Sequence, residues 1–446
     1  MSSRSRRNIV RGTVIRACRE GSARPRSGST GPELVSSSSA SNGHVVYKDS
    51  TRLSAEFFSN LLQDYTTIVL PFLPIVSENE FASAIAEKKP DQTGSAFVKI
   101  LGAITLNMRC SWLGEEETDR NQINLLYTQA LQQRGALMPD HQITVRTLVI
   151  PLFAATCILD INPNSDMGVY YLREAITGIQ ILGVDDPSRA VRLDASDRAQ
   201  QERLYWVLFI HERLLSITSR RRPTLSALPN LLQPDPTIPE GVLKGFNQII
   251  LLFKTIDDTF MTHWIDRQAP TLTMAWIEEK QSQLSGINDD WEDQIKELSQ
   301  MQQIDLLVTR DWLRTLVWQV ALSRFFLTSD GRPSRHFMDI TFPALISRRL
   351  RMMLTATPRQ AVEIHGTGIL HKVFEIVSML GDLLELVLHA TCDDRTIIDH
   401  LDDYSFLYTF LNSMSKFDPV EQTILNTRFM TVQAQYPALS TLTGTG

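Results

Sequence analysis

Four pairs of adjacent aspartates suggest metal chemistry most directly, because carboxylate oxygens are the ligands that Mg²⁺ prefers. The pairs are Asp257-Asp258, Asp289-Asp290, Asp393-Asp394 and Asp402-Asp403. A helical magnesium site of the diphosphate-binding kind needs a further acid three positions on, but Asp393-Asp394 is followed by Asp399 instead. Asp289-Asp290 falls at an expected helix start, where acids are favoured without any ligand. Solvated surface acids are therefore the better interpretation of all four pairs.

The histidines lack the spacing of known catalytic centres. His211-Glu212 is followed by Arg-Leu-Leu, so the HExxH pattern of a zinc protease does not form. His365 and His371 lie close in sequence, but no nucleophile elbow, P-loop or dinucleotide fingerprint accompanies them. We expect a protein that is not an enzyme and that uses no cofactor.

The cysteines do not indicate a metal site either. The chain contains Cys18, Cys110, Cys157 and Cys392, with no CxxC pair among them. Cys110 and Cys157 have apolar neighbours, so we expect buried, inert thiols and a reducing compartment. His389 and His400 on one continuous helix would be about three turns, roughly 16 Å, apart, which is too far to share an ion.

Charge is distributed unevenly along the 446 residues. Residues 1–47 carry eight arginines against two glutamates, about +6, so the formal net charge of −6 leaves −6 − 6 = −12 for the remainder. This segment is rich in Ser, Gly and Arg, and we expect a disordered basic arm. The candidates for nonspecific phosphate contacts are Arg4, Arg6, Arg7, Arg11, Arg16 and Arg19. A solvated tail and a mitochondrial transit peptide are the alternatives, the latter weakened by Pro25.

Helical periodicity begins near Ser50 and continues almost to the end, with no run of alternating strands. The pattern predicts an all-α protein. The expected helices span approximately 52–66, 79–88, 94–110, 117–133, 142–157, 166–182, 196–219, 240–263, 273–286, 289–326, 340–355, 358–391 and 417–434. The apolar runs are too short to span a bilayer, so we expect no membrane segment.

A proline-rich connection follows the seventh expected helix. Its prolines are Pro223, Pro229, Pro234, Pro236 and Pro239, and its interleaved leucines, which we expect to pack, are Leu225, Leu228, Leu231 and Leu232. Proline fixes the backbone and favours an extended path. We therefore divide the chain into a basic arm (1–47), a helical region (48–240) and a C-terminal helical half packed on it (241–446).

Residues 166–183 read as an amphipathic helix with clear ends. Ser165 or Asp166 is suited to cap its start, and Gly183 lies where a left-handed cap belongs. Leu172, Ala175, Ile176, Ile179 and Leu182 recur at helical spacing and form one apolar face. The small residues Ala175 and Gly178 permit the close approach of another helix.

Residues 200–223 contain a helix that has to be buried. Leu204 to Ile210 are seven apolar residues in succession, so the helix is apolar on every side and must be surrounded. We expect it to be the central pillar of the fold. Arg220, Arg221 and Arg222 crowd its C-terminal end, where positive charge complements the helix dipole, and Pro223 ends it.

These segments match a known family in order and type. The sequence reads Tyr-Leu-Arg-Glu-Ala-Ile at 171–176, Leu-Gly at 182–183, Glu-Arg-Leu-Tyr-Trp-Val-Leu-Phe-Ile-His-Glu-Arg at 202–213 and Arg-Arg-Pro-Thr-Leu at 221–225. Together they resemble the middle homology region of fungal-specific transcription factors, in particular the maltose and amylase regulators. The stretch 61–81, which passes through Leu-Pro-Phe-Leu-Pro-Ile-Val-Ser-Glu-Asn-Glu-Phe, resembles the opening of that region. The resemblance covers about 55–240.

The family usually binds DNA through six cysteines that hold two zinc ions, and a single cysteine near the N-terminus, Cys18, cannot build that cluster. Two explanations stay open: the protein naturally lacks this module, or the gene model has lost it. For the sequence as given, we expect a regulatory helical domain whose contact with DNA is indirect or nonspecific. The resemblance also implies partners: other transcription factors or a homodimer partner, and a small-molecule inducer. The effector or partner candidates are His211, Arg220, Arg221 and Arg222. A core histidine bonded to a neighbouring helix, and a solvated basic helix end, are the simpler interpretations of these four residues.

The sequence and the resemblance together lead to one expected function and two alternatives. We expect a nuclear transcription regulator or co-regulator of a single pathway, such as a biosynthetic gene cluster of secondary metabolism. The first alternative is a non-catalytic helical scaffold, located in the cytoplasm. The second is an all-α enzyme of the terpene-synthase type, which the spacing of the aspartate pairs disfavours.

Overall fold

The computed structural model describes residues 54–113, 117–136, 143–190, 193–266, 272–285, 291–328, 341–386 and 394–436. Every regular element in these ranges is a helix, which confirms the predicted all-α class. The basic arm and its arginines lie outside the described residues, as do Cys18 and Cys392. Within the described ranges, no helix has the length and apolar character needed to cross a membrane.

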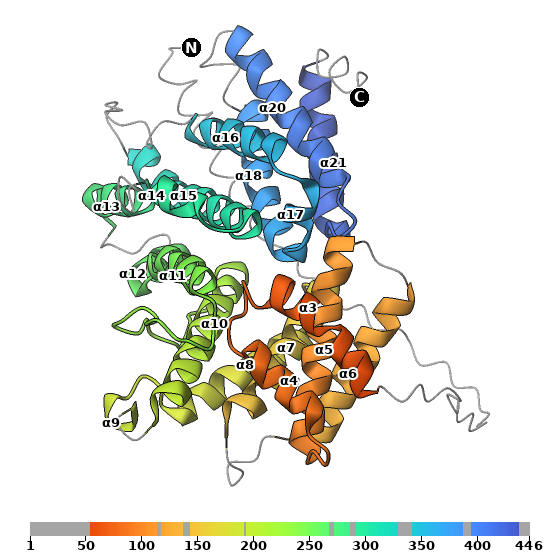
Figure 1. Cartoon of the computed structure of the whole chain (residues 1–446). Coiled ribbons are helices and arrows are strands. Elements are labelled where there is room, and N and C mark those ends of the chain that lie inside the picture. The colour runs from red at the N-terminus through yellow and green to blue at the C-terminus, as the bar shows by residue number, and fades with distance from the viewer. Residues whose placement is uncertain are drawn as a thin grey trace, which may run out of the picture.

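The first twelve elements pack together in the lower part of Figure 1. They are α2 (Ala55–Asn60), α3 (Leu62–Asp64), the π-helical turn η1 (Tyr65–Val69), α4 (Glu78–Ala86), α5 (Gln92–Leu113), α6 (Glu117–Arg134), α7 (Val145–Ile161), α8 (Asp166–Leu182), α9 (Pro187–Ala190), α10 (Ala195–Ser219), α11 (Glu240–Lys254) and α12 (Asp258–Ile265). Helix α5 packs on α6 and α7, and α7 packs on α8.

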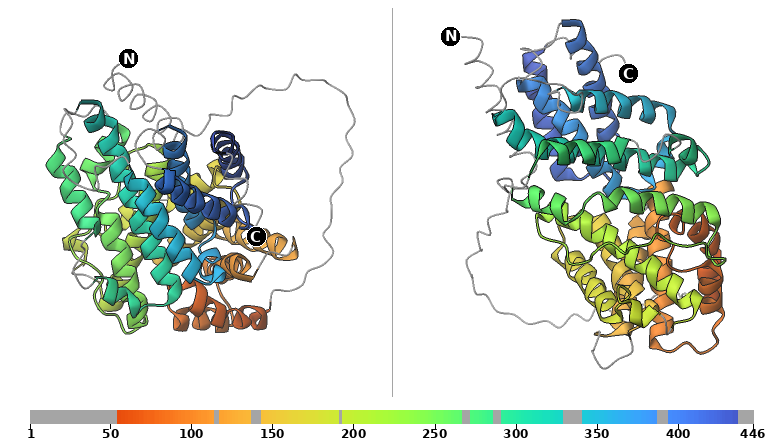
Figure 2. Two further views of the ribbon diagram at one scale, coloured as in Figure 1. Left: turned by 90° about the horizontal axis from the view of Figure 1, so that it is seen from above. Right: turned by 90° about the vertical axis from the view of Figure 1, so that its left-hand side faces the viewer.

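The remaining helices form the upper part of Figure 1 and of the right-hand view in Figure 2. They are α13 (Met274–Ser285), α14 (Trp291–Lys296), α15 (Gln300–Thr328), α16 (Phe342–Ala356), α17 (Arg359–Glu363), α18 (Gly366–Leu386), α20 (Asp394–Asn412) and α21 (Pro419–Gln435). Helix α18 contacts α15, α16, α20 and α21. The two parts meet where α11 contacts α15 and α17 contacts α5.

The caps and faces of α8 agree with the sequence prediction. The Gly168 amide donates to Ser165 Oγ at 3.4 Å, and Gly183 ends the helix with φ +67°. A Cβ atom at Gly178 would lie 2.1 Å from Leu148 Cδ2, so glycine leaves room for this side chain of α7 against α8. The small-residue prediction is therefore confirmed.

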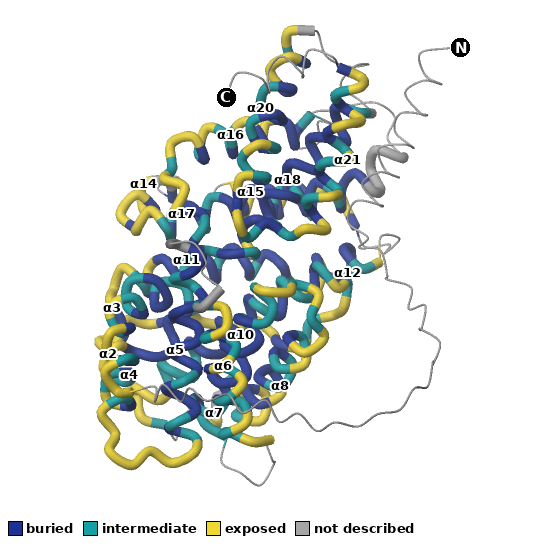
Figure 3. The backbone as a smooth tube through the Cα atoms, turned by 90° about the vertical axis from the view of Figure 1, so that its right-hand side faces the viewer, coloured by how far each residue is buried: buried dark blue, intermediate teal, exposed yellow. Residues whose placement is uncertain are grey.

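Helix α10 is the buried pillar that its sequence predicts. All seven residues from Leu204 to Ile210 are buried, and the helix contacts α7, α8 and α11. Figure 3 shows the buried segments concentrated on the inner faces of both parts of the molecule. One continuous apolar core extends from Phe58 to Tyr436. The thiols of Cys110 and Cys157 are buried in it, as expected, and burial raises the pKa of Cys157.

Three of the longer predicted helices are interrupted, and two described helices, the short α9 and the long α20, were missed. Expected helix 240–263 breaks before Asp257, which caps α12 by accepting from Phe260 N. Expected helix 289–326 breaks at Ser299, whose hydroxyl accepts from Gln302 N. Expected helix 358–391 breaks at Gly366, where φ is +60°. Apolar periodicity continues across all three breaks, so it could not reveal them. Helix α20 was not predicted at all.

The leucines of the proline-rich connection pack as expected. Leu225, Leu228 and Leu232 are buried, and Leu231 is partly buried against the core. The connection has no helical turn between Arg221 and Leu228.

Candidate functional site

The motif segments 171–176, 202–213 and 221–225 meet at one carboxylate. Glu212 of α10 is fully buried, and its Oε1 accepts from Thr224 N at 2.9 Å and Thr224 Oγ1 at 2.8 Å. Its Oε2 accepts from Leu225 N at 2.8 Å. Arg173 of α8 donates to Oε1 at 2.6 Å. A buried charge requires such partners, so Glu212 holds the Arg-Pro-Thr-Leu corner and α8 against the pillar.

The neighbouring Arg213 fixes the far side of the same helix. Its Nε donates to Ile256 O at 3.1 Å, and its guanidinium lies 4.0 Å from the ring centroid of Phe209. The backbone carbonyl belongs to the turn between α11 and α12. The Glu-Arg pair in the motif therefore positions the elements on both sides of α10.

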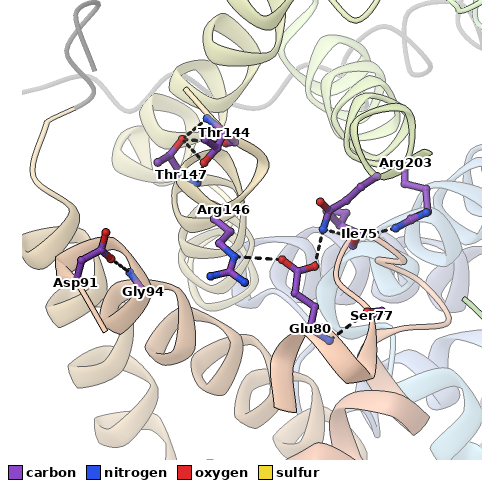
Figure 4. Close-up of polar contacts among 10 residues, drawn as sticks. Ile75, Ser77, Glu80, Asp91, Gly94, Thr144, Arg146, Thr147 and Arg203 are labelled. Atoms are coloured by element: carbon purple, nitrogen blue, oxygen red, sulfur yellow. Dashed lines mark hydrogen bonds and ion pairs between the residues drawn. The ribbon is translucent and has the colours of Figure 1, made fainter. Parts of the chain in front are cut away.

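The stretch 71–81 is held by a second polar network, shown in Figure 4. Glu80 accepts from Arg146 Nε of α7 at 3.2 Å and from Gln200 Nε2 of α10 at 2.6 Å. Arg203, also on α10, donates to Ile75 O at 3.3 Å and forms a buried ion pair with Asp235. The acidic residue of this stretch thus joins α4, α7 and α10.

The upper and lower parts of the molecule are joined at Asp160 near the end of α7. Its Oδ1 accepts from Thr367 N at 3.0 Å and Thr367 Oγ1 at 3.1 Å, at the start of α18. Its Oδ2 accepts from Asn107 Nδ2 of α5 at 3.2 Å and from Lys416 Nζ at 2.6 Å. A Cβ atom at Gly366 would lie 2.3 Å from Asp160 Oδ1. Glycine at this position permits the contact.

A cavity of about 360 Å³ lies beside this contact. Its wall is mainly apolar and comes from α5, α7, α10 and α11 below and from α15, α18 and the turn before α18 above. Phe72, Ile210, Phe246 and Trp312 are among the residues that line it. The volume and apolar wall are typical of a small-molecule site.

Most polar side chains in the wall are already bonded to the protein. Lys372 donates to Thr309 Oγ1 at 2.7 Å and to Asp305 Oδ1 at 3.3 Å. Burial by itself would raise the pKa of Asp305, but Lys372 opposes this and holds that pKa below its usual value. His371 Nδ1 bonds Glu421 Oε1 at 2.5 Å. Each of these charged or ionisable groups therefore has a partner within the protein.

His211, a candidate from the sequence, lines the cavity. Its Nδ1 bonds Val207 O at 2.8 Å, one turn earlier on the same helix. The expectation of a partner on a neighbouring helix is wrong, because the i−4 carbonyl lies within reach of the ring. A carbonyl only accepts, so Nδ1 carries the proton and Nε2 is an acceptor. Burial lowers the pKa of His211, and Lys372 lowers it further, so the ring is neutral.

His365 lines the same cavity from the upper side. Its Nε2 bonds Met301 O at 3.0 Å, which leaves Nδ1 as the acceptor nitrogen. The ring packs edge-on against Phe72, with centroids 4.6 Å apart. Burial lowers the pKa of His365 as well. In the sequence His365 drew notice only as a possible catalytic residue, and no local motif indicated that it would line the same cavity as His211.

The three arginines at the end of α10 do not reach this cavity. Arg220 adopts a left-handed conformation with φ 52° and lies 5.8 Å from the ring centroid of Trp264. Arg221 and Arg222 are exposed to solvent. The structure therefore separates the candidates into a cavity residue, His211, and a basic surface at the helix end.

The aspartate pairs that the structure describes act as caps and ion pairs. Asp257 caps α12 and also accepts from Lys280 Nζ at 2.5 Å. Asp402 and Asp403 both accept from Arg351. Asp289-Asp290 lies outside the described residues, as do Asp393 and the side chain of Asp394. No group of three His, Cys, Asp or Glu side chains in the described ranges is arranged to hold a metal ion.

The sequence is distantly similar to three curated fungal proteins. It is 22% identical over 249 residues to the probable sucrose utilization protein SUC1 of Candida albicans. It is 23% identical over 218 residues to the maltose fermentation regulatory protein MAL63 of Saccharomyces cerevisiae. It is also 23% identical over 382 residues to the maltose fermentation regulatory protein MAL13 of the same species. These similarities support the resemblance to the maltose regulators at a distant level.

The extent of these matches limits what they establish. They cover 54%, 47% and 80% of this chain, and 47%, 44% and 75% of the respective relatives, so the chain spans about half the length of the first two. None of the three is named as an enzyme, in agreement with the expectation of a non-catalytic protein. No family model matches the sequence, and no solved structure matches it.

Proposed function

We propose that this protein is a transcription regulator or co-regulator that acts in the nucleus on the genes of one pathway. The similarity to the two maltose fermentation regulatory proteins is the observation that carries this proposal. Each relative is named for the use of a single sugar, which favours a narrow set of target genes over a general role. A biosynthetic gene cluster is one such set.

The helical domain would act by binding an effector or a partner. A ligand in the cavity would touch α10 and α11 of the lower part and α15 and α18 of the upper part at once. It can therefore change how the two parts pack, and a change in packing can be transmitted to a partner. The exposed Arg221 and Arg222 offer a basic surface to another regulator or to a second copy of the chain.

Contact of these 446 residues with DNA would be indirect or nonspecific. The 446 residues contain four cysteines, fewer than the six that the two-zinc cluster needs. We expect the purified chain to hold no stoichiometric zinc and to bind DNA without a sequence preference that survives raised salt. A footprint of the chain alone on a defined site would contradict this.

Deletion of the gene in its host tests the regulatory role. We expect a fluorescently tagged chain to accumulate in the nucleus, and RNA sequencing of the deletion strain to show the loss of a small group of transcripts. Cytosolic localisation with unchanged transcripts would refute the proposal and favour the non-catalytic scaffold.

A tethering assay separates regulation from DNA contact. The full chain is fused to an unrelated DNA-binding domain upstream of a reporter gene. A change in reporter output relative to the DNA-binding domain alone supports a regulatory domain. The matched control is the same fusion with Arg221→Glu and Arg222→Glu. We expect it to fold normally, because both side chains are exposed, and to lose part of the output if an acidic partner binds this surface.

A further inference from the structure

The cavity has the size of a molecule with two or three rings. A cavity of roughly 150 Å³ lined by Leu, Ile and Phe binds benzene. The present cavity, at about 360 Å³, is more than twice as large and is likewise mainly apolar. Phe72, Phe246, Phe253 and Trp312 supply aromatic faces to its wall.

The polar groups that remain for a ligand are hydrogen-bond acceptors. Lys372, Asp305 and Asp160 already have protein partners. Among the residues that the structure describes, His211 Nε2 and His365 Nδ1 have no hydrogen-bond partner. Each ring donates its single proton to a backbone carbonyl, so both remaining nitrogens present a lone pair.

We propose that the cavity binds a neutral, mainly apolar molecule of two or three rings that carries hydroxyl groups, and that these hydroxyls donate to His211 Nε2 and His365 Nδ1. The proposal rests on the effector-binding function above and names the chemistry of the effector. A hydroxyl is the donor that fits, because its uncharged form avoids the cost of burying an ion.

The same wall disfavours a disaccharide, although the relatives are named for sugars. A disaccharide carries a hydroxyl on nearly every ring carbon, and each one must find a partner when it leaves water. Thr156 and Thr218 in the wall donate to carbonyls of their own helices. Two histidine nitrogens cannot satisfy a whole disaccharide.

Equilibrium dialysis with matched probes tests the class of ligand. The purified full chain is dialysed against 2-naphthol, naphthalene and maltose. One hydroxyl hydrogen bond corresponds to roughly 3- to 10-fold in affinity, so 2-naphthol should bind tighter than naphthalene by about this factor. Maltose should neither bind nor displace 2-naphthol. Equal binding of the two aromatic probes, or displacement by maltose, would overturn the proposal.

Two variants of His211 separate its two nitrogens. His211→Asn places an amide near the position of Nδ1, keeps a donor for Val207 O and removes the acceptor in the cavity. We expect this variant to lose the preference for 2-naphthol over naphthalene. His211→Gln places its amide oxygen near the position of Nε2, and we expect it to retain most of the preference. A preference unchanged in His211→Asn contradicts a direct bond to Nε2.

His365 gives an independent test, in case His211→Asn fails to fold. His365→Gln keeps a donor for Met301 O and removes the acceptor at Nδ1. His400→Asn is the control, because His400 is a buried histidine of α20 that does not line the cavity. We expect His365→Gln to reduce the preference for 2-naphthol and His400→Asn to leave it unchanged. If His365→Gln and His211→Asn both keep the full preference, the proposal is wrong.

The binding result and the tethering result fail in different ways. Selective binding of 2-naphthol with no reporter activity in any fusion would refute the proposed regulatory function and support the proposed binding site. Reporter activity without any binding of 2-naphthol would support the regulatory function and refute the proposed ligand class.

Discussion

Replacement of Glu212 by glutamine tests whether the central motif is a structural junction. The change keeps the size of the side chain and removes its charge. The oxygen of the new amide can still accept from Thr224 N and Oγ1. The amide nitrogen would take the place of Oε2 and face Leu225 N, so that one hydrogen bond is lost and two donors meet.

The expected destabilisation follows from these contacts. Loss of a hydrogen bond to a buried charge costs about 1.5–3 kcal/mol. The pairing with Arg173 adds about 1 kcal/mol at most, because that side chain is 31% exposed and water screens the interaction. The sum is about 3 kcal/mol. With an unfolding entropy of about 2 cal/mol/K per residue, a chain of this size would melt roughly 3 °C lower.

Thermal melting of the purified chain measures this effect. The control is Glu279→Gln, an exposed glutamate in the middle of α13, which should change the melting temperature by less than about 1 °C. A second variant pair, Arg173→Met with and without Glu212→Gln, should show a coupling of about 1 kcal/mol. If Glu212→Gln melts within about 1 °C of the parent chain, the carboxylate does not hold the corner, and the structural account of the motif is refuted.

Three further perturbations follow from the packing. Gly178→Val should destabilise the chain by about 1–3 kcal/mol in chemical denaturation, because the new side chain would collide with Leu148. Asp160→Ala should speed hydrogen exchange at the start of α18, since it removes the acceptor that joins the two parts of the molecule; unchanged exchange there would contradict this role. Burial raises the pKa of Asp382 to about 6, against the opposing effect of Arg428. The folded state therefore holds this proton more tightly than the unfolded state, and stability should fall as pH rises from about 4 through 6. Asp382→Asn should flatten that part of the melting-temperature profile, and a profile identical to the parent would count against the assignment.

The elements that the sequence predicted best have strong local signals. Helix α8 has a serine at its start, a glycine at its end and one apolar face, all of which act within a few residues. Helix α10 has seven apolar residues in succession, so burial was the only stable outcome. These signals depend on neighbours in the chain and need no tertiary information.

The elements that were missed depend on contacts between distant residues. Helix α20 contains acidic residues such as Asp402 and Asp403, which weaken the apolar pattern of its sequence. In the folded chain Arg351 of α16 pairs with both aspartates, a contact that the local sequence does not reveal. The cavity is less predictable still, because its wall draws on residues from Pro71 to Glu421. His211 could be selected as a candidate from its own helix, but nothing in the sequence indicates that it shares a cavity with His365.

The structure assigns different roles to the motifs and to the cavity. The motif residues Glu212, Glu80 and Arg203 are used in holding helices together, so their presence in a sequence predicts this architecture and not a particular ligand. The cavity wall combines apolar residues with two acceptor nitrogens. His211 belongs to the 202–213 motif, but His365 and most other wall residues lie outside the motifs. A protein that keeps the motifs and changes the wall would retain the fold while it answered to a different molecule. Exchange of wall residues such as His211 and His365 should therefore alter ligand preference with little change in melting temperature. Exchange of Glu212 should lower the melting temperature and leave the ligand preference of the folded chain unchanged.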